Sequence, residues 1–354
     1  GGRWGKGVQR TIEKRLVAAT TTGAGAALLP GLGGGPDRNK TTRSGMGRAF
    51  SWVTVEMRGW RPAMEDATCV LLGLDAPLES QAFFGVFDGH GGAAVSERAA
   101  EALPSQVVSC AAGLEQAEDV AAQALGMALP ALDEQLREAG AGMQGIMPAS
   151  PIALSLDDCA PNAFNLTGST AVVALMECDG PPVEGSPLRV VVANCGDSRA
   201  MLCRGGRAIP LSEDQKPDVP EERARIERAG GFVAPVGPCQ RIDGWGLNLS
   251  RALGDFHYKA REDLPASEQK VTAVPEVRSC ELTEEDEFLL LCCDGVFELK
   301  SSQEAVDHVR RGLQSGMVPT EVVEDLVDSC CSPDLFQTKG QGSDNVSAML
   351  VLFH

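Results

Sequence analysis

Histidine is scarce in this sequence, and its cysteines form no recognisable metal or disulfide pattern. There are four histidines in 354 residues, and none of the twelve cysteines belongs to a C-x-x-C pair. So few histidines argue against a zinc site. Cysteines without a regular spacing usually act as small buried hydrophobic residues, and they indicate a protein of a reducing compartment. A zinc protein and a disulfide-stabilised secreted protein are therefore both disfavoured.

Long apolar runs and a positive net charge are missing too. No stretch approaches the ~20 residues needed to span a bilayer, and the first residues do not resemble a secretory signal. The net charge of −18 argues against a nucleic-acid binder, which would carry a basic patch or stripe. We expect an intracellular protein of the cytoplasm or nucleus, without a transmembrane segment or a nucleic-acid partner, that acts as a monomer.

The first 48 residues differ in composition from the rest of the chain. They contain nine Lys or Arg residues against two acids, Glu13 and Asp37, and residues 31–35 are nearly all glycine. Because this segment has little apolar patterning, we predict a flexible, basic, Gly-rich arm over residues 1–48, with one short helix around residues 11–19. Such an arm is expected to be dispensable for the function of the rest of the chain. Residues 49–354 would then form the functional domain.

Residues 49–354 alternate between strand patterns and pairs of helix patterns. Strands are expected at residues 52–58, 68–74, 82–87, 169–176, 189–193, 200–204, 208–211, 287–293 and 346–353. Helices are expected at residues 93–112, 114–138, 303–313 and 320–329, with a short one between Pro220 and Gly230. Residues 139–166 resemble a surface insertion, and residues 231–248 a projecting loop. This order predicts an α+β fold, a four-layer αββα sandwich of two antiparallel β-sheets flanked by helix pairs.

One short stretch, residues 87–92 (FDGHGG), places a carboxylate and an imidazole between a strand pattern and a helix pattern. Its three glycines let the backbone approach a ligand closely. Taken alone, the stretch could equally be a strand-to-helix turn in which Asp88 makes local hydrogen bonds and His90 only packs.

Other acidic residues share this position at the start or the end of an expected strand. A carboxylate next to an apolar strand is partly desolvated, and several of them at one end of a sandwich would repel one another. A divalent cation removes both penalties, because Mg²⁺, Mn²⁺ and Ca²⁺ prefer oxygen ligands. Any single acid could be a turn former, but the set favours a metal site. Its members are Glu65, Asp66, Asp88, Asp197, Asp294 and Asp344.

Eight segments around these acids resemble, in order, the motifs of the metal-dependent protein phosphatase 2C (PPM) family. The resemblance covers nearly all of the chain after the arm, from about residue 51 to residue 353. The segments are residues 61–66 (RPAMED), 87–92 (FDGHGG), 168–171 (GSTA), 194–200 (NCGDSRA), 214–217 (DQKP), 249–255 (LSRALGD), 293–296 (CDGV) and 344–345 (DN).

The resemblance implies a protein serine/threonine phosphatase with two Mg²⁺ or Mn²⁺ ions and a third, weaker metal site. A hydroxide bridging the two ions would attack phosphoserine or phosphothreonine in protein substrates. By similarity, Asp88 would bridge both ions, the carbonyl of Gly89 would bind one, and Asp294 and Asp344 would hold the other. Asp197, together with Asp294, would frame the third site.

The remaining roles implied by the resemblance concern water and substrate. Glu65 and Asp66 would orient metal-bound waters, Arg61 would clamp the substrate phosphate, and His90 would be the general acid. A planar guanidinium suits phosphate, and a serine or threonine alkoxide needs a proton when it leaves.

Three segments depart from the family pattern. Gln215 stands where the family usually has histidine, and Glu298 stands where it usually has a shorter acid. Gln341 precedes the Gly-Ser-Asp-Asn run, in which the family commonly has one more residue between Ser and Asp.

Two other kinds of protein remain as alternatives. A catalytically dead phosphatase-like scaffold would be expected to lack Asp88, Asp294 or Asp344, and all three are present. A calcium-binding module would place its acids within one loop of about a dozen residues, whereas here they are spread from Glu65 to Asp344.

Overall fold

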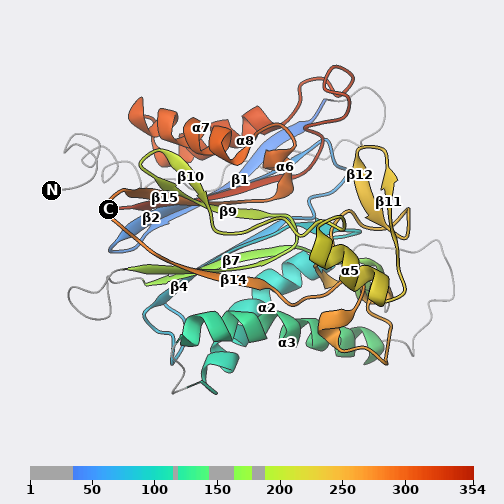
Figure 1. Ribbon diagram of the computed structural model, residues 1–354. Coiled ribbons are helices and arrows are strands. Elements are labelled where there is room, and N and C mark those ends of the chain that lie inside the picture. The colour runs from blue at the N-terminus through green and yellow to red at the C-terminus, as the bar shows by residue number, and fades with distance from the viewer. Residues whose placement is uncertain (1–34, 115–118, 143–162, 178–187) are drawn as a thin grey trace.

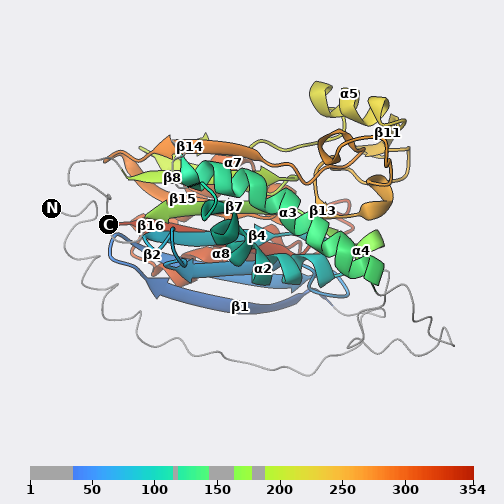
Figure 2. The same cartoon turned by 90° about the horizontal axis from the view of Figure 1, so that it is seen from below.

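The computed structural model describes residues 35–114, 119–142, 163–177 and 188–354, and these residues form four layers (Figure 1). Two antiparallel β-sheets lie face to face in the middle, and a pair of helices covers the outer face of each sheet (Figures 1 and 2). The predicted α+β sandwich is therefore confirmed.

The first sheet brings the last strand of the chain beside an early one. Its six strands, in spatial order, are β1 (Asp37–Met46), β2 (Phe50–Gly59), β16 (Val346–Phe353), β15 (Asp286–Cys292), β9 (Arg199–Arg204) and β10 (Arg207–Pro210). Every residue of β16 is buried, because helices cover one face of the sheet and the second sheet covers the other. This explains its continuous apolar sequence, since a strand buried on both faces does not alternate.

The second sheet has five strands and the same antiparallel pairing. In spatial order they are β14 (Glu276–Glu281), β8 (Arg189–Cys195), β7 (Ala171–Glu177), β4 (Gln81–Phe87) and β3 (Ala67–Leu72). Alternate residues of β4 serve two cores. Phe83 and Phe87 pack against the covering helices, whereas Phe84 and Val86 pack against the first sheet. The period of two along a strand separates these faces.

Two helix pairs close the outer layers. The first sheet is covered by α7 (Ser302–Gln314) and α8 (Pro319–Cys330), and the second by α2 (Ala94–Ala111) and α3 (Val120–Gly142). At the start of α7, Ser301 and Glu304 each bind the other's backbone N–H. This capping box satisfies two N–H groups that the helix leaves unpaired.

Short elements gather toward one end of the sandwich. They are the three-stranded sheet of β13 (Leu253–Gly254), β6 (Gly168–Ser169) and β5 (Gly89–His90), the hairpin of β11 (Val233–Val236) and β12 (Cys239–Ile242), the helices α4 (Ala163–Leu166), α5 (Pro220–Arg228) and α6 (Asp294–Phe297), and the 3₁₀ turns η1 (Phe256–Tyr258) and η2 (Ala266–Glu268). The predicted projecting loop contains the hairpin β11–β12. As expected, α5 begins at Pro220 and stops before Gly230, whose φ is +83°.

The predicted boundary of the arm is wrong at its C-terminal side. Residues 37–46 form β1, which pairs with β2 from Asp37 opposite Gly59 to Met46 opposite Ser51. β1 also contacts α8, where Lys40 Nζ lies 2.6 Å from a carboxylate oxygen of Asp328. An edge strand carries polar residues, and its sequence therefore lacks the apolar pattern by which the other strands were predicted. Residues 1–34, with the helix predicted at residues 11–19, lie outside the described residues.

This correction changes what truncation should do. Removal of residues 1–34 is expected to leave the unfolding temperature unchanged. Turnover on a small phosphopeptide should stay within a few-fold of that of the full chain. Removal of residues 1–46 should lower the unfolding temperature by several degrees. The hydrogen bonds between β1 and β2 would be lost, and each contributes about 1 kcal/mol to the free energy of unfolding. Thermal unfolding of both truncated chains tests this. Equal unfolding temperatures would show that β1 contributes nothing to stability.

Two other segments differ from the prediction. The expected insertion at residues 139–166 is helical at both ends, since α3 continues to Gly142 and α4 spans Ala163–Leu166; residues 143–162 lie outside the described part. β14 was not predicted, because most of its residues are only half-buried at a sheet edge. Among the described helices, none combines the length and the hydropathy that crossing a membrane would require.

Candidate metal centre and active site

The acids predicted to form a site lie at one end of the sandwich, all on loops except Asp294, which is the first residue of α6. Both sheets contribute, and each acid lies within two residues of a strand. Glu65 and Asp66 precede β3, Asp88 follows β4, Asp197 lies between β8 and β9, Asp294 follows β15, and Asp344 lies two residues before β16. In antiparallel strands the end of one lies beside the start of its neighbour, so segments far apart in the sequence meet here.

The centre of the site is formed by Asp66 and Cys293, which are buried, and by Asp88, which is half-buried. One ligand atom from each of these residues lies within 4.8 Å of the others. Asp66 is nearly inaccessible, and one of its carboxylate oxygens accepts a 2.7 Å hydrogen bond from the hydroxyl of Ser347 in β16. This arrangement joins the loop before β3, the end of β4 and the end of β15.

Burial and like charge together raise the pKa values of the central carboxyls. Burial raises the pKa of Asp66 to about 7, with a contribution from the charge of Asp344. Burial also raises the pKa of Asp88 well above its usual range, and the charges of Asp66 and Asp294 add to the effect. The pKa of Asp294 is raised well above its usual range by burial and by the charges of Asp197 and Asp344. So many buried carboxylates are unfavourable together unless a cation balances them.

The donor set fits a hard divalent cation. Carboxylate oxygens from separate loops converge on a buried point, and such oxygens are the ligands that Mg²⁺, Mn²⁺ and Ca²⁺ prefer. The thiol of Cys293 is a poor nucleophile here, because burial raises its pKa well above 9.0 and the charges of Asp66 and Asp88 raise it further.

Arg61 lies at the exposed side of this centre. Its side chain is half exposed, and its guanidinium donates a 2.6 Å hydrogen bond to a carboxylate oxygen of Asp344. A guanidinium has five N–H donors in a planar fork, so one bond to Asp344 leaves further donors for a phosphate.

Asn345 holds the loop that carries Arg61 and Glu65. Its amide nitrogen donates to the carbonyl oxygens of Arg58 (2.8 Å) and Ala63 (3.1 Å), and its amide oxygen accepts from the backbone N–H of Glu65 (2.9 Å). The sequence contained Asn345 in a motif but did not indicate this role, which depends on contacts 280 to 287 positions away.

Gly89 is required by close packing at the centre. A Cβ atom at this position would lie less than 3.0 Å from the carbonyl oxygen of Glu65 and from the hydroxyl of Ser96. That hydroxyl itself donates a 2.5 Å hydrogen bond to the Glu65 carbonyl. Any side chain at position 89 would therefore displace the loop of Glu65.

Asp197 is buried and forms an ion pair with Lys216. Burial opposes the charge of Lys216, but the Asp197 carboxylate outweighs it and raises the pKa of Lys216. The residue before Lys216 is Gln215, which accepts a 2.7 Å hydrogen bond from the N–H of Gly196 and donates at 3.2 Å to the carbonyl of Asn194. Glutamine thus anchors the loop of Asp197 in place of the family's usual histidine.

Glu298 faces the loop that precedes Asp344. One of its carboxylate oxygens accepts hydrogen bonds from the N–H groups of Gly342 (2.6 Å) and Ser343 (3.2 Å). The longer side chain therefore supports the Asp344 loop through the backbone.

His90 forms a close pair with an acid to which sequence reasoning gave no role. Its Nε2 lies 2.6 Å from a carboxylate oxygen of Asp255, which is 1% exposed. Burial by itself would lower the pKa of His90, but the hydrogen bond and charge of Asp255 outweigh burial and raise the pKa above 6.5. Asp255 ends the motif at residues 249–255, and this was the only signal in the sequence that could have identified it.

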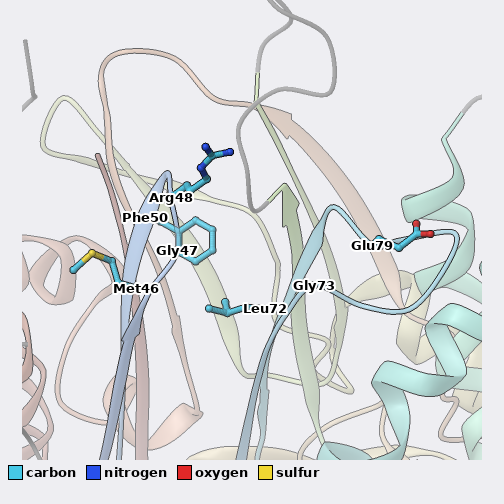
Figure 3. Close-up of a pocket in the computed structure, with 7 residues that line it drawn as sticks. All are labelled: Met46, Gly47, Arg48, Phe50, Leu72, Gly73 and Glu79. Carbon is cyan, nitrogen blue, oxygen red and sulfur yellow. The ribbon is translucent and has the colours of Figure 1, made fainter. Parts of the chain in front are cut away.

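A cavity of about 480 Å³ lies elsewhere and is not part of this site (Figure 3). It is lined by Met46, Gly47, Arg48, Phe50, Leu72, Gly73 and Glu79. These residues lie at the start of β2 and the end of β3, whereas the metal centre lies at the opposite ends of the same strands. It shows no gathering of carboxylates like that of the metal centre.

A cluster of carboxylates with raised pKa values at one end of the sandwich is a candidate site for metal-assisted hydrolysis. Residues 51–335 match the family model described as "Protein phosphatase 2C". The chain is 37% identical to "Protein phosphatase 2C 1" of Paramecium tetraurelia over 320 residues, which cover 89% of this chain and 96% of the relative. It is 35% identical to "Probable protein phosphatase 2C 21" of Arabidopsis thaliana over 341 residues, with 90% and 91% covered.

Solved structures agree with this match. A phosphatase from Toxoplasma gondii superimposes with a TM-score of 0.66 at 27% identity, over 89% of this chain and 96% of that one. The chain belongs to the protein phosphatase 2C family, and it is accordingly a metal-dependent protein phosphatase that acts on phosphoproteins.

Proposed function

We propose that this protein hydrolyses phosphoserine and phosphothreonine in proteins with two Mg²⁺ or Mn²⁺ ions, as a monomer in the cytoplasm or nucleus. The observation that carries the proposal is the convergence of Asp66, Asp88 and Cys293 from three separate segments, with the charges of Asp294 and Asp344 close enough to raise the neighbouring pKa values. The serine/threonine preference is supported by family membership.

The residues present fit the two ions. Asp88 and the carbonyl of Gly89 would hold one ion, and Asp88, Asp294 and Asp344 the other. By similarity to the family, Glu65 and Asp66 would orient metal-bound waters, and Asp197 with Asp294 would frame a third, weaker site. In the structure the Asp197 carboxylate pairs with Lys216. When bound, the ions supply a water of lowered pKa as the nucleophile.

The protein's own groups then act on the substrate. Arg61 binds the phosphate oxygens, and its hydrogen bond to Asp344 keeps the guanidinium beside the carboxylate centre. His90 donates a proton to the serine or threonine oxygen as the bond from phosphorus to that oxygen breaks. The mechanism gives no nucleophilic role to Cys293, whose thiol is buried and has its pKa raised by that burial.

Both alternatives are less well supported. A dead scaffold would not need to retain buried carboxylates that raise one another's pKa values, because they destabilise the metal-free fold. A calcium module would draw its ligands from one loop, whereas these acids come from several loops on two sheets.

A metal-dependence assay tests the proposal. Phosphate release from a phosphothreonine peptide should require added Mg²⁺ or Mn²⁺ and should stop when a chelator is present in excess. Full activity in chelator, or none in either metal, would contradict the proposed function. A phosphotyrosine peptide of the same sequence is the control for substrate class, and it should be hydrolysed more slowly.

A further inference from the structure

The pair formed by His90 and Asp255 is built by three short strands. In the sheet β13–β6–β5, Gly168 of the middle strand pairs with His90 on one side and with Gly254 on the other. Asp255 directly follows Gly254. The two side chains therefore meet over Gly168, although they are 165 positions apart in the sequence.

Gly168 leaves the space in which the pair forms. A Cβ atom on Gly168 would lie less than 3.0 Å from both the Asp255 carboxylate and His90 Nε2. Such distances are not found for real Cβ atoms, so any residue other than glycine would push the carboxylate and the imidazole apart.

The backbone of Asp255 is held in an uncommon conformation. Its φ of 52° lies in the left-handed region, which few residues other than glycine adopt, although Asp and Asn tolerate it best. Its N–H donates to the carbonyl of Thr167 (2.9 Å), and its carbonyl accepts from the N–H of Tyr258 (2.9 Å). These bonds point the carboxylate at His90.

The nearby buried cation does not compete for Asp255. Lys259 donates instead to both carboxylate oxygens of Asp133, at 2.8 and 2.7 Å, and Asp133 also accepts from the N–H of Gly254. Within the part of the chain that the structure describes, His90 is the only side chain found to hydrogen-bond to the Asp255 carboxylate.

We propose that Asp255 is a positioning residue that orients His90 for proton donation. Its carboxylate binds Nε2–H, and Nδ1 is then the ring nitrogen left to face the leaving group. As the bond from phosphorus to the substrate oxygen breaks, that oxygen takes the Nδ1 proton, and the neutral imidazole keeps its Nε2–H bond to Asp255. Solvent returns the proton for the next turnover. This assignment rests on the proposed function, because it needs a basic leaving group.

Asp255→Asn is the variant of choice. Asparagine has nearly the same shape and tolerates the left-handed backbone, but it removes the negative charge and replaces one carboxylate oxygen with an NH₂ group. We expect turnover of a phosphothreonine peptide to fall by about tenfold or more, part of the ~10²–10⁴-fold that a general acid supplies. Turnover of nitrophenyl phosphate should change much less, because nitrophenolate leaves without a proton. The measured quantity is the turnover rate on the phosphothreonine peptide divided by the rate on nitrophenyl phosphate, both at saturating Mn²⁺.

Two further variants separate positioning from damage to the fold. Asp243→Asn is the matched control. Asp243 lies in the projecting loop and has nearly the same φ (54°), but it pairs with Lys270, and this variant should keep the wild-type ratio. Gly168→Ala should lower the ratio as Asp255→Asn does. In the double variant with His90→Gln, Asp255→Asn should cost nothing more, since the residues act as one unit.

The outcomes distinguish this assignment from the proposed function. An unchanged ratio in Asp255→Asn, with a lowered ratio in His90→Gln, would overturn the positioning role and leave the phosphatase assignment intact. A wild-type protein without metal-dependent activity would overturn both. In every case proton NMR can detect the pair directly, because the chain has only four histidines. A downfield imidazole N–H signal should be lost in His90→Gln and should move upfield in Asp255→Asn, where the acceptor is neutral, and its absence from the wild type would refute the hydrogen bond.

Discussion

Asp88→Asn and Asp294→Asn are each expected to abolish metal-dependent phosphate release while the protein stays folded. Both side chains end apolar strands, where burial and neighbouring acids already disfavour the charge. Loss of one metal-binding carboxylate should reduce turnover by at least about 10²-fold, which is the typical cost of one strong electrostatic contact in an active site.

The same variants should be as stable as the wild type without metal, or more stable. Each removes a buried negative charge that has no cation to balance it, and such a charge is costly. Thermal unfolding in excess chelator measures this difference. The pair of results separates a ligand from an ordinary structural residue, whose loss would lower activity and stability together.

Asp263→Asn is the matched control, because Asp263 is an exposed acid that pairs with Arg261 at the surface. Its turnover and its unfolding temperature should not change. Near-wild-type turnover of Asp88→Asn or Asp294→Asn in Mn²⁺ would show that the ligand assignment is wrong.

His90→Gln should slow the hydrolysis of a phosphothreonine peptide about 10²–10⁴-fold more than that of nitrophenyl phosphate. A threonine alkoxide is strongly basic and needs a proton on departure, whereas nitrophenolate does not. The comparison is made at saturating metal, so that any change in metal affinity does not enter. It separates a general acid from a residue that only packs beside Asp88.

His308→Gln provides the control for this experiment. His308 also hydrogen-bonds to an aspartate, Asp325 at 2.9 Å, but it lies on α7 in the outer helix layer. Its loss should leave both rates unchanged. Equal losses on the two substrates in His90→Gln would mean that the turn after β4 had moved, and His90 could then not be assigned as the general acid.

The buried strands and the covering helices were predictable because their patterns are local. β16 is a continuous apolar run because it is buried on both faces, and α7 shows its capping box in adjacent residues. β1 was not predictable in this way. Its polar residues lie at a sheet edge beside α8. Its strand conformation therefore depends on pairing with β2 and on contact with α8, which its own sequence does not indicate.

The acids of the candidate site could be identified from the sequence for a similar reason. Asp88 follows β4 directly, and Asp294 follows β15 after Cys293. A desolvated carboxylate in such a place is costly unless a cation or hydrogen bonds balance it, so these acids could be recognised as candidates. The roles of Asn345 and Lys216 had no such signal. Each acts through a partner in a distant segment, the loop before β3 for Asn345 and Asp197 for Lys216.

By itself the sequence determined the type of fold, the family resemblance and the set of acids that a cation would have to balance. These follow from apolar periodicity and from carboxylates placed beside strands, which are properties of neighbouring residues. Only the tertiary structure decided which groups touch: Asp66 with Ser347, Arg61 with Asp344, and His90 with Asp255 over Gly168. The physical reason is that hydrogen bonds and charge interactions act over a few ångströms. Partners 165 to 283 positions apart therefore interact only after the strands have paired.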